Sequence, residues 1–189
     1  MRIIAGNFRS RTLAAPPGLA TRPTSDRLRE TLFNVLAPRI EGAFFLDLYA
    51  GSGAVGIEAL SRGAAHVEFV ERGEPALRVL RANLARLRLT AGFRIHNASG
   101  PAVLRRMKTV ERFDVVFLDP PYDAVGEYAA TLGLLGGSAM GLLADGALVI
   151  TEHRKKERLE ESYGVLGRTR LLVQGDAALS FYSAVADEG

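Results

Sequence analysis

Residues 47–53 read Asp47-Leu48-Tyr49-Ala50-Gly51-Ser52-Gly53, and they decide the fold because they join a buried strand to a helix. The apolar run Phe44 to Leu48 predicts the strand, and the helix extends from about Ala54 to Arg62. A glycine loop in this position lets a ligand approach the backbone, while the helix N-terminus attracts an anionic group. The loop and the first helical turn fit the nucleotide-binding pattern G-x-G-x-x-G, with Gly51, Gly53 and Gly56 as its glycines.

Beyond this loop, short apolar runs alternate with helical segments, which predicts a parallel sheet with crossover helices. The last two runs flank a turn and predict an antiparallel hairpin. We therefore expect an α/β fold with a Rossmann-like, mostly parallel sheet that a C-terminal antiparallel hairpin closes. The further predicted strands are His66 to Val70, Phe93 to Asn97, Phe113 to Leu118, Ala147 to Thr151 after an Asp145-Gly146 turn, Gly164 to Val173 and Ala178 to Ala184. The further predicted helices begin at Thr24 or Ser25 as N-cap, at Pro75, at Pro101 and at about Val125.

The acids around the glycine loop suggest which ligand it takes. Glu71 lies 18 residues after Gly53, at the end of the next strand, where an acid binds ribose hydroxyls in dinucleotide folds. Asp47 suits a cationic amine better than a pyrophosphate, and the chain is too short for a second dinucleotide half plus a catalytic domain, so NAD is disfavoured. S-adenosylmethionine, an adenosine that carries an amine and a carboxylate, fits better. We expect Asn97 and Ala98, around the end of the third strand, beside its adenine.

A second motif, Asp119-Pro120-Pro121-Tyr122, follows the predicted strand Phe113 to Leu118. It should lie at the carboxyl edge of the sheet, where open α/β folds bind their ligands. Two consecutive prolines hold the chain extended and leave the Asp119 carboxylate and the Pro120 carbonyl free to accept hydrogen bonds. Such acceptors beside an aromatic ring suit a planar group with an NH2. The candidate catalytic residues are therefore Asp119, Pro120, Pro121 and Tyr122.

The composition excludes several classes of protein. The 189 residues suit one domain with an appendage, and the absence of cysteine excludes disulfides and thiolate metal sites, which fits a cytoplasmic protein. His66, His96 and His153 lie far apart, so we expect them at the surface or at strand ends and expect no metal. The N-terminus does not resemble a secretory signal, and the most apolar window falls short of the about 20 residues of a membrane span. We expect a soluble monomer that binds no membrane.

Positive charge is concentrated near the N-terminus. Residues 1–39 contain seven arginines against Asp26 and Glu30, a balance of +5, whereas the whole chain carries only +3. Such a cluster indicates a polyanionic partner such as nucleic acid, although an ordinary solvated surface would give the same pattern. We expect residues 1–22 to form a basic hairpin arm ahead of a catalytic domain over residues 23–189. The arginines expected to bind RNA are Arg2, Arg9, Arg11, Arg22, Arg27 and Arg29.

The two motifs together resemble the class I S-adenosylmethionine-dependent methyltransferases, and Asp-Pro-Pro-Tyr resembles the signature of those that methylate an exocyclic amino nitrogen. A closer resemblance is to the RsmD family, bacterial guanine-N2 methyltransferases of small-subunit (16S) ribosomal RNA. It covers nearly the whole chain, although Glu127 to Leu143 matches little of the family pattern. The residues that carry it are Arg22 to Asn34, Asp47 to Gly53, Glu58 to Ala64 and Phe113 to Tyr122.

The resemblance implies a role for each candidate. It implies that the partner is 16S ribosomal RNA in the small ribosomal subunit or an assembly intermediate, and that Asp119 to Tyr122 contact the target base. It also implies a set of contacts to S-adenosylmethionine, with Asp47 and the glycine loop at the methionine end, Glu71 at the ribose and the third strand's end at the adenine. That set is Asp47, Tyr49, Ala50, Gly51, Ser52, Gly53, Glu71, Asn97 and Ala98.

The expected mechanism is positional. Asp119 and the Pro120 carbonyl would accept the two N–H bonds of the amine and aim its lone pair, while Tyr122 would stack on the base. The proton leaves after methyl transfer, so this mechanism does not require a raised pKa for Asp119. The alternatives are an amino-methyltransferase of DNA bases or of protein glutamine, and a catalytically silent RNA-binding module. An NAD dehydrogenase is a more distant alternative.

Overall fold

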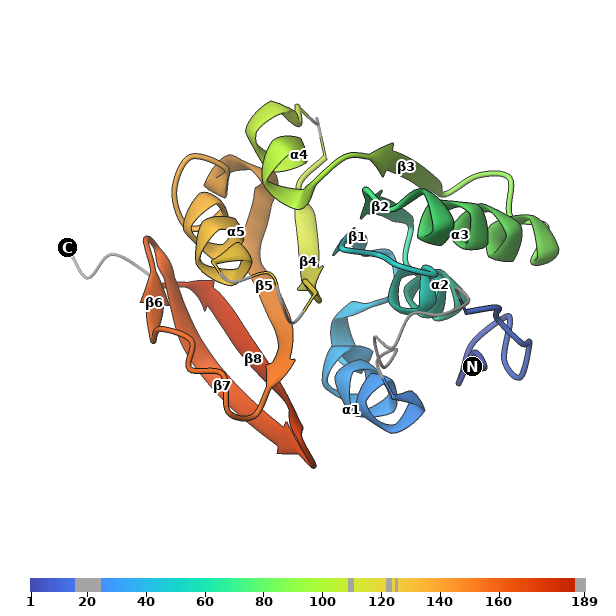
Figure 1. Ribbon diagram of the computed structural model, residues 1–189, viewed down its shortest axis with the longest axis horizontal. Coiled ribbons are helices and arrows are strands. Elements are labelled where there is room, and N and C mark those ends of the chain that lie inside the picture. Colours follow the sequence, from blue (N-terminus) through green and yellow to red (C-terminus); the bar gives the residue numbers. More distant parts are fainter. Residues whose placement is uncertain (16–24, 109–110, 122–123, 125, 186–189) are drawn as a thin grey trace.

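A computed structural model describes residues 1–15, 25–108, 111–121, 124 and 126–185. Its centre is an eight-stranded sheet in the order β3-β2-β1-β4-β5-β8-β7-β6 (Figure 1). Strands β1 to β5 are parallel to one another, and β8 lies antiparallel between β5 and β7. The strands are β1 (Phe44–Leu48), β2 (His66–Glu71), β3 (Phe93–Asn97), β4 (Phe113–Leu118), β5 (Leu143–Arg154), β6 (Ser162–Tyr163), β7 (Leu166–Gln174) and β8 (Ala177–Ala184). This arrangement confirms the predicted fold class.

Helices cover both faces of the sheet (Figure 1). One core cluster joins the first three helices to one face through residues such as Phe33, Ile57 and Leu80, and a second cluster joins α4 and α5 to the other face. Within the described residues, every helix is too short or too polar to span a lipid bilayer. The helices are α1 (Asp26–Leu36), α2 (Ala54–Ser61), α3 (Glu74–Arg86), α4 (Gly100–Arg106) and α5 (Glu127–Leu135), with 3-10 turns η1 (Ala37–Arg39) and η2 (Met140–Leu142).

The register places the candidate site at one edge of the sheet. Leu48, the last residue of β1, pairs with Val70 of β2 and with Leu118 of β4. The residues that follow these three positions therefore meet at the same carboxyl edge. The glycine loop, Glu71 and Asp119 come together there, as the sequence predicted.

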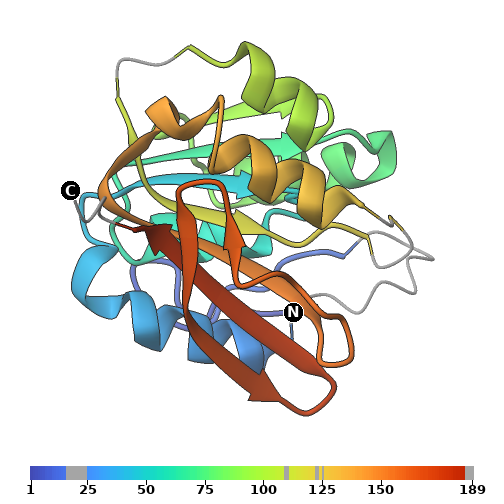
Figure 2. The ribbon, with the colours of Figure 1, turned by 90° about the vertical axis from the view of Figure 1, so that its left-hand side faces the viewer.

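The fifth strand was predicted too short. It was expected over Ala147 to Thr151, whereas β5 extends from Leu143 to Arg154. The expected turn at Asp145-Gly146 lies within the strand, where the pairing with β4 shifts register and Gly146 has a φ of 73°. At its other end β5 continues because β8 pairs with it as far as Arg154 and Ala177. Figure 2 shows the resulting long β5–β8–β7 ribbon across the front of the molecule.

The N-terminal segment forms a minimal hairpin that lies against the body of the protein. Its bridge pairs Arg2 with Thr12, and Ile3 and Leu13 are buried in the core cluster that contains the first helices. The carboxylate of Glu58 on α2, itself fully buried, accepts the N–H groups of Ile4 at 2.8 Å and Ala5 at 3.0 Å. The segment is therefore fixed to α2. A boundary after residue 22 stays a prediction because that position lies outside the described residues.

Candidate active site at the carboxyl edge of the sheet

The glycine loop adopts backbone conformations that favour glycine. Gly51 and Gly53 have φ values of 58° and 81°, and Tyr49 has a φ of 66°. A Cβ on Gly53 would lie 2.3 Å from Cδ1 of Leu80, so this glycine allows α3 to pack closely. A Cβ on Gly51 would meet no atom within 4 Å. The space beside Gly51 is thus open to a ligand, whereas that beside Gly53 is filled by the protein.

Asp47 lies beneath the loop with 1% of its surface exposed. Its Oδ2 accepts the N–H of Gly56 at 2.9 Å, and this N–H belongs to the first turn of α2, where backbone donors lack helical partners. Burial raises the pKa of Asp47 to about 7; the Gly56 hydrogen bond opposes this rise and the charge of Glu71 adds to it. The carboxylate therefore holds the helix against the loop and is disfavoured in its charged form.

Glu71 connects the end of β2 to the glycine loop. Its Oε2 accepts the N–H of Gly51 at 2.9 Å, and its Oε1 accepts that of Gly73 at 2.7 Å. An ionised carboxylate has about four acceptor positions, so each oxygen retains one for a ligand hydroxyl. Together with the open space at Gly51, this arrangement fits a ribose next to the loop.

The hydroxyl of Tyr49 lies in a polar contact that the sequence did not predict. It donates to Oε2 of Glu127 at 2.5 Å and lies 2.7 Å from Oγ1 of Thr131. Burial and the Glu127 carboxylate raise the pKa of Tyr49. Arg72, directly after β2, lies 3.9 Å from Oε1 of the same glutamate. The first turn of α5 therefore supports the loop, and the unmatched sequence around Glu127 contained no signal for this contact.

Asp119 follows β4 and is partly buried at the sheet edge. Its pKa is well above its usual value because burial disfavours the charge, and because the charges of Glu152 and Asp47 repel it. Glu152 comes from β5, next to Thr151, which pairs with Leu118. The same rule that found Asp119, an acid after a strand, would have found Glu152, since the predicted strand ended at Thr151.

The remaining candidates differ in how the structure places them. Asn97 ends β3, and its Nδ2 donates to Oε1 of Glu74 at 2.8 Å. The N–H of Ala98 donates to the carbonyl of Glu71 at 3.2 Å, which keeps both residues near the loop. Pro120 is buried and Pro121 is exposed. Tyr122 lies outside the described residues, so its stacking role stays a prediction.

Asn83 of α3 connects two distant segments through its side chain, and the sequence did not predict these contacts. Its Nδ2 donates to the carbonyls of Ser52 at 3.0 Å and Ala14 at 3.1 Å, and its Oδ1 accepts the N–H of Ala14 at 2.9 Å. It is 1% exposed and lies on the apolar face of α3 between Leu80 and Leu84. A polar residue on an otherwise apolar helix face is the feature of the sequence that could have indicated a buried hydrogen-bonding role. Asn83 therefore ties the N-terminal segment to the glycine loop.

We expect Asn83→Ala to lower the free energy of unfolding by about 2 to 4 kcal/mol, because it removes three hydrogen bonds and leaves buried backbone groups unpaired. Thermal and urea unfolding measure this loss. Ala82→Ser changes an exposed neighbour on the same helix and should leave stability nearly unchanged. Equal stability of the two variants would contradict the bridging role.

The predicted RNA-binding arginines divide into exposed and buried ones. Arg2, Arg9, Arg11 and Arg27 are exposed, and Arg22 lies outside the described residues. Arg29 is fully buried; its Nη2 donates to the carbonyl of Arg2 and to Oδ1 of Asp26, and its Nε lies 3.7 Å from Oε2 of Glu58. This burial is at odds with the expected RNA contact of Arg29. The sequence could not reveal it, because Glu58 reaches Arg29 only through the packing of α1 on α2.

Two of the three histidines meet at one carboxylate, and the third lies elsewhere in the sheet. Nε2 of His66 on β2 lies 3.1 Å from the carboxylate of Glu68 on the same strand. Nε2 of His96 on β3 lies 2.5 Å from that carboxylate. His153 lies near the end of a strand, β5, which is one of the two expected positions. It is nevertheless buried, with 2% of its surface exposed. No group of three or more His, Cys, Asp or Glu side chains that could hold a metal occurs among the described residues.

The strand order, with β8 antiparallel beside β5, and the acids at the carboxyl ends of β1, β2 and β4 define a protein of the class I methyltransferase fold. Within that class, the chain belongs to the family described as Conserved hypothetical protein 95, whose family model matches residues 1–183. This result confirms the family membership predicted from the sequence.

Named relatives agree with that assignment. Over 186 residues the chain is 39% identical to Ribosomal RNA small subunit methyltransferase D of Escherichia coli K12, covering 98% of this chain and 91% of that protein. It matches the structure of "Putative methyltransferase yhhF" from Escherichia coli with a TM-score of 0.84 and 36% identity, over 99% of each chain. It also matches Thermus thermophilus 16S rRNA N2 G1207 methyltransferase (RsmC) in complex with AdoMet and guanosine, with a TM-score of 0.70 and 20% identity, over 96% of this chain and 49% of that one. At that identity the last likeness shows the fold alone.

Proposed function

We propose that this chain transfers a methyl group from S-adenosylmethionine to the exocyclic N2 of a guanine in 16S ribosomal RNA, during assembly of the small ribosomal subunit. The observation that carries the proposal is the meeting of Asp119 with the glycine loop and Glu71 at one sheet edge. The E. coli relative named for this class of substrate supports the choice of RNA. A cytoplasmic location is part of the proposal because the substrate is ribosomal.

The cofactor would lie across the ends of β1 and β2. The free acceptor positions of Glu71 suit the ribose hydroxyls, and the open space at Gly51 lets the ligand approach the backbone. The charge of Asp47 would favour the cationic methionine end, and Ala98 would lie at the adenine. When bound, S-adenosylmethionine supplies an electrophilic methyl group, so that the nitrogen–carbon bond forms as the carbon–sulfur bond breaks.

Asp119 would orient the guanine amine. Its carboxylate and the Pro120 carbonyl would accept the two N–H bonds, which localises the nitrogen lone pair and aims it at the methyl group. After transfer the nitrogen is positively charged and acidic, and its proton leaves. The mechanism itself does not require the raised pKa of Asp119, but that shift makes the carboxylate a better acceptor for this proton.

The exposed arginines of the N-terminal segment and α1 would contact phosphates. Such contacts supply affinity with a steep salt dependence but read little sequence. Replacing Arg2, Arg9 and Arg11 together with alanine should reduce the slope of log affinity against log salt for small-subunit RNA by about 2. Filter binding or anisotropy over a range of salt concentrations measures the slope. Replacing Arg78, Arg81 and Arg86, exposed on α3, removes the same charge and should leave the slope nearly unchanged.

The proposed function is tested with labelled S-adenosylmethionine. The protein is incubated with unmethylated small subunits, free ribosomal RNA and DNA, and the label is mapped by nuclease digestion and mass spectrometry. We expect the label on N2 of a guanine in 16S RNA. Label in DNA, or no label in any nucleic acid, would contradict the proposal and point to a DNA enzyme, a protein substrate or a silent module.

A further inference from the structure

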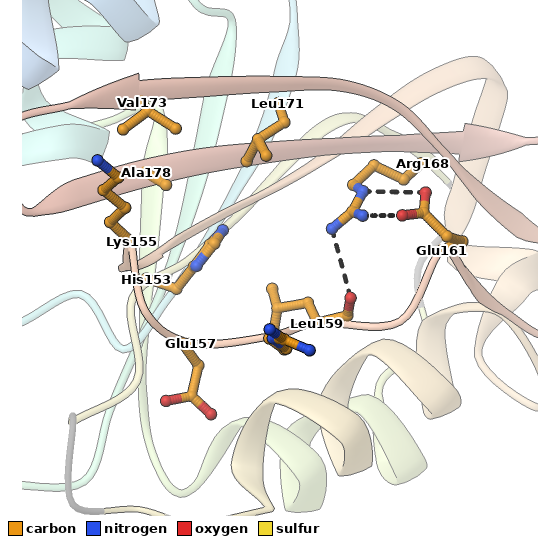
Figure 3. Close-up of a pocket in the computed structure, with 10 residues that line it drawn as sticks. His153, Lys155, Glu157, Leu159, Glu161, Arg168, Leu171, Val173 and Ala178 are labelled. Atoms are coloured by element: carbon orange, nitrogen blue, oxygen red, sulfur yellow. Dashed lines mark hydrogen bonds and ion pairs between the residues drawn. The ribbon is translucent and has the colours of Figure 1, made fainter.

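A cavity of about 300 Å³ lies where β5, β8 and β7 face the loop that follows β5 (Figure 3). None of its residues was a candidate in the sequence analysis. Its size is at the lower end of the range for ligand pockets, about 300 to 1,000 Å³, and suits one planar ring system better than a whole cofactor. The residues that matter most are His153 on β5, Leu171 and Val173 on β7, and Lys155, Glu157 and Arg158 in the loop.

One wall of the cavity is apolar and open to solvent. Leu171 and Val173 are 48% and 50% exposed and stand on the same face of β7, because they are two residues apart in a strand. Figure 3 shows both side chains above the cavity, with Leu159 of the loop on the opposite side. Large apolar side chains gathered in an open hollow favour a ligand with a flat apolar face.

The rim of the cavity is polar and carries positive charge. Within the described part of the chain, no ion pair engages Lys155 or Arg158, whereas Arg168 is paired with Glu161. Glu157 is the remaining acid of the lining and offers an acceptor. Two cations, one acceptor and an apolar wall match a nucleotide, whose phosphate is anionic, whose base has a polar edge and whose faces are apolar.

His153 makes the inner end of the cavity rigid. Its Nδ1 donates to the carbonyl of Arg154 at 2.9 Å, and its Nε2 lies 2.9 Å from Oγ of Ser180, which donates to it. The ring of Tyr128 on α5 packs edge-to-face on it with centroids 6.5 Å apart. Burial lowers the pKa of His153, so the ring is neutral at pH 7. The inner end is therefore preformed.

The cavity lies just beyond the edge that carries Asp119, on the face of the sheet that α5 covers, whereas alternation along the strands places the Asp119 side chain on the other face with that of Glu152. Thr151 pairs with Leu118, the residue immediately before Asp119. His153 lies two residues further along β5, about 7 Å from Thr151. We propose that this cavity binds a nucleotide of the ribosomal RNA that flanks the methylated guanosine, with its base against Leu171 and Val173 and its phosphate near Lys155 and Arg158. The inference rests on the proposed function and names a second contact of the same substrate.

Binding of RNA tests this inference separately from catalysis. The probe is a fluorescently labelled, single-stranded RNA decamer of mixed sequence, followed by anisotropy with the full chain. Two variants alter the cavity, Leu171→Ser with Val173→Ser, and Lys155→Ala with Arg158→Ala. Two controls, Met140→Ser and Lys108→Ala, change an apolar side chain and a cation that are exposed near the starts of β5 and β4, at the other edge of the sheet. Melting temperatures and S-adenosylmethionine affinities verify that each variant is folded.

We expect each cavity variant to lose about tenfold in affinity for the decamer and the controls to lose little. With unmethylated small subunits, the cavity variants should show a similarly raised KM. Unchanged decamer binding by both cavity variants would overturn the inference, even where the subunit KM rises, because a ribosomal protein would then be the occupant. Failure of the wild-type protein to methylate any RNA would instead contradict the proposed function, and the decamer measurement would still decide the cavity.

Discussion

Asp119→Ala is expected to slow methyl transfer by about 100- to 1,000-fold while S-adenosylmethionine binds with nearly normal affinity. The reason is that its carboxylate would act on the guanine amine, whereas the cofactor would be held mainly by the glycine loop and Glu71. Single-turnover rates with labelled cofactor measure the step, and calorimetry measures cofactor affinity. Asp119→Asn keeps one acceptor oxygen and should fall between the wild type and the alanine variant.

Asp114→Ala is the matched control for this prediction. Asp114 lies on the same strand, and its Oδ2 accepts the N–H of Phe44 at 2.8 Å near the other edge of the sheet. Its loss should lower stability and leave the methyl-transfer rate of the folded protein nearly unchanged. Normal turnover by Asp119→Ala would refute the catalytic assignment.

Asp47→Asn is expected to stabilise the ligand-free protein at pH 8 and to weaken S-adenosylmethionine binding by about tenfold or more. The pKa of Asp47 rises from 3.8 to about 7 on folding, so the folded state holds its proton more tightly than the unfolded state. The stability that the folded protein gains from this tighter proton binding is complete below pH 3.8, declines as the pH rises and is lost above about 7. Asparagine keeps an acceptor for Gly56 without the charge.

The advantage of Asp47→Asn over the wild type should therefore be larger at pH 8 than at pH 5, which thermal unfolding in the two buffers measures. Wild-type affinity for the cationic cofactor should rise as the pH increases through 7, because the ionised carboxylate attracts it, and the variant should lose much of this rise. Asp47→Ala separates the helix contact from the charge, since it removes both. If the Asp47→Asn variant were less stable than the wild type at pH 8, the buried charge of Asp47 would not be what destabilises the folded protein.

The sequence by itself determined the order of the core elements and the chemistry of the sheet edge. Periodicity and glycine placement act within a few residues, so β1, β3 and β4 were predicted with their observed bounds. Because parallel strands end together, the sequence alone places the acids at their ends at one site. The prediction of S-adenosylmethionine followed from those acids and the glycine loop.

Only the tertiary structure decided what those residues touch. The burial of Arg29, the Asn83 bridge, the contact of Tyr49 with Glu127 and the cavity beside His153 all join segments far apart in the chain. The raised pKa of Asp119 likewise depends on Glu152 and Asp47 from neighbouring strands. Burial and electrostatic coupling arise from packing between distant segments, and local sequence patterns do not encode them.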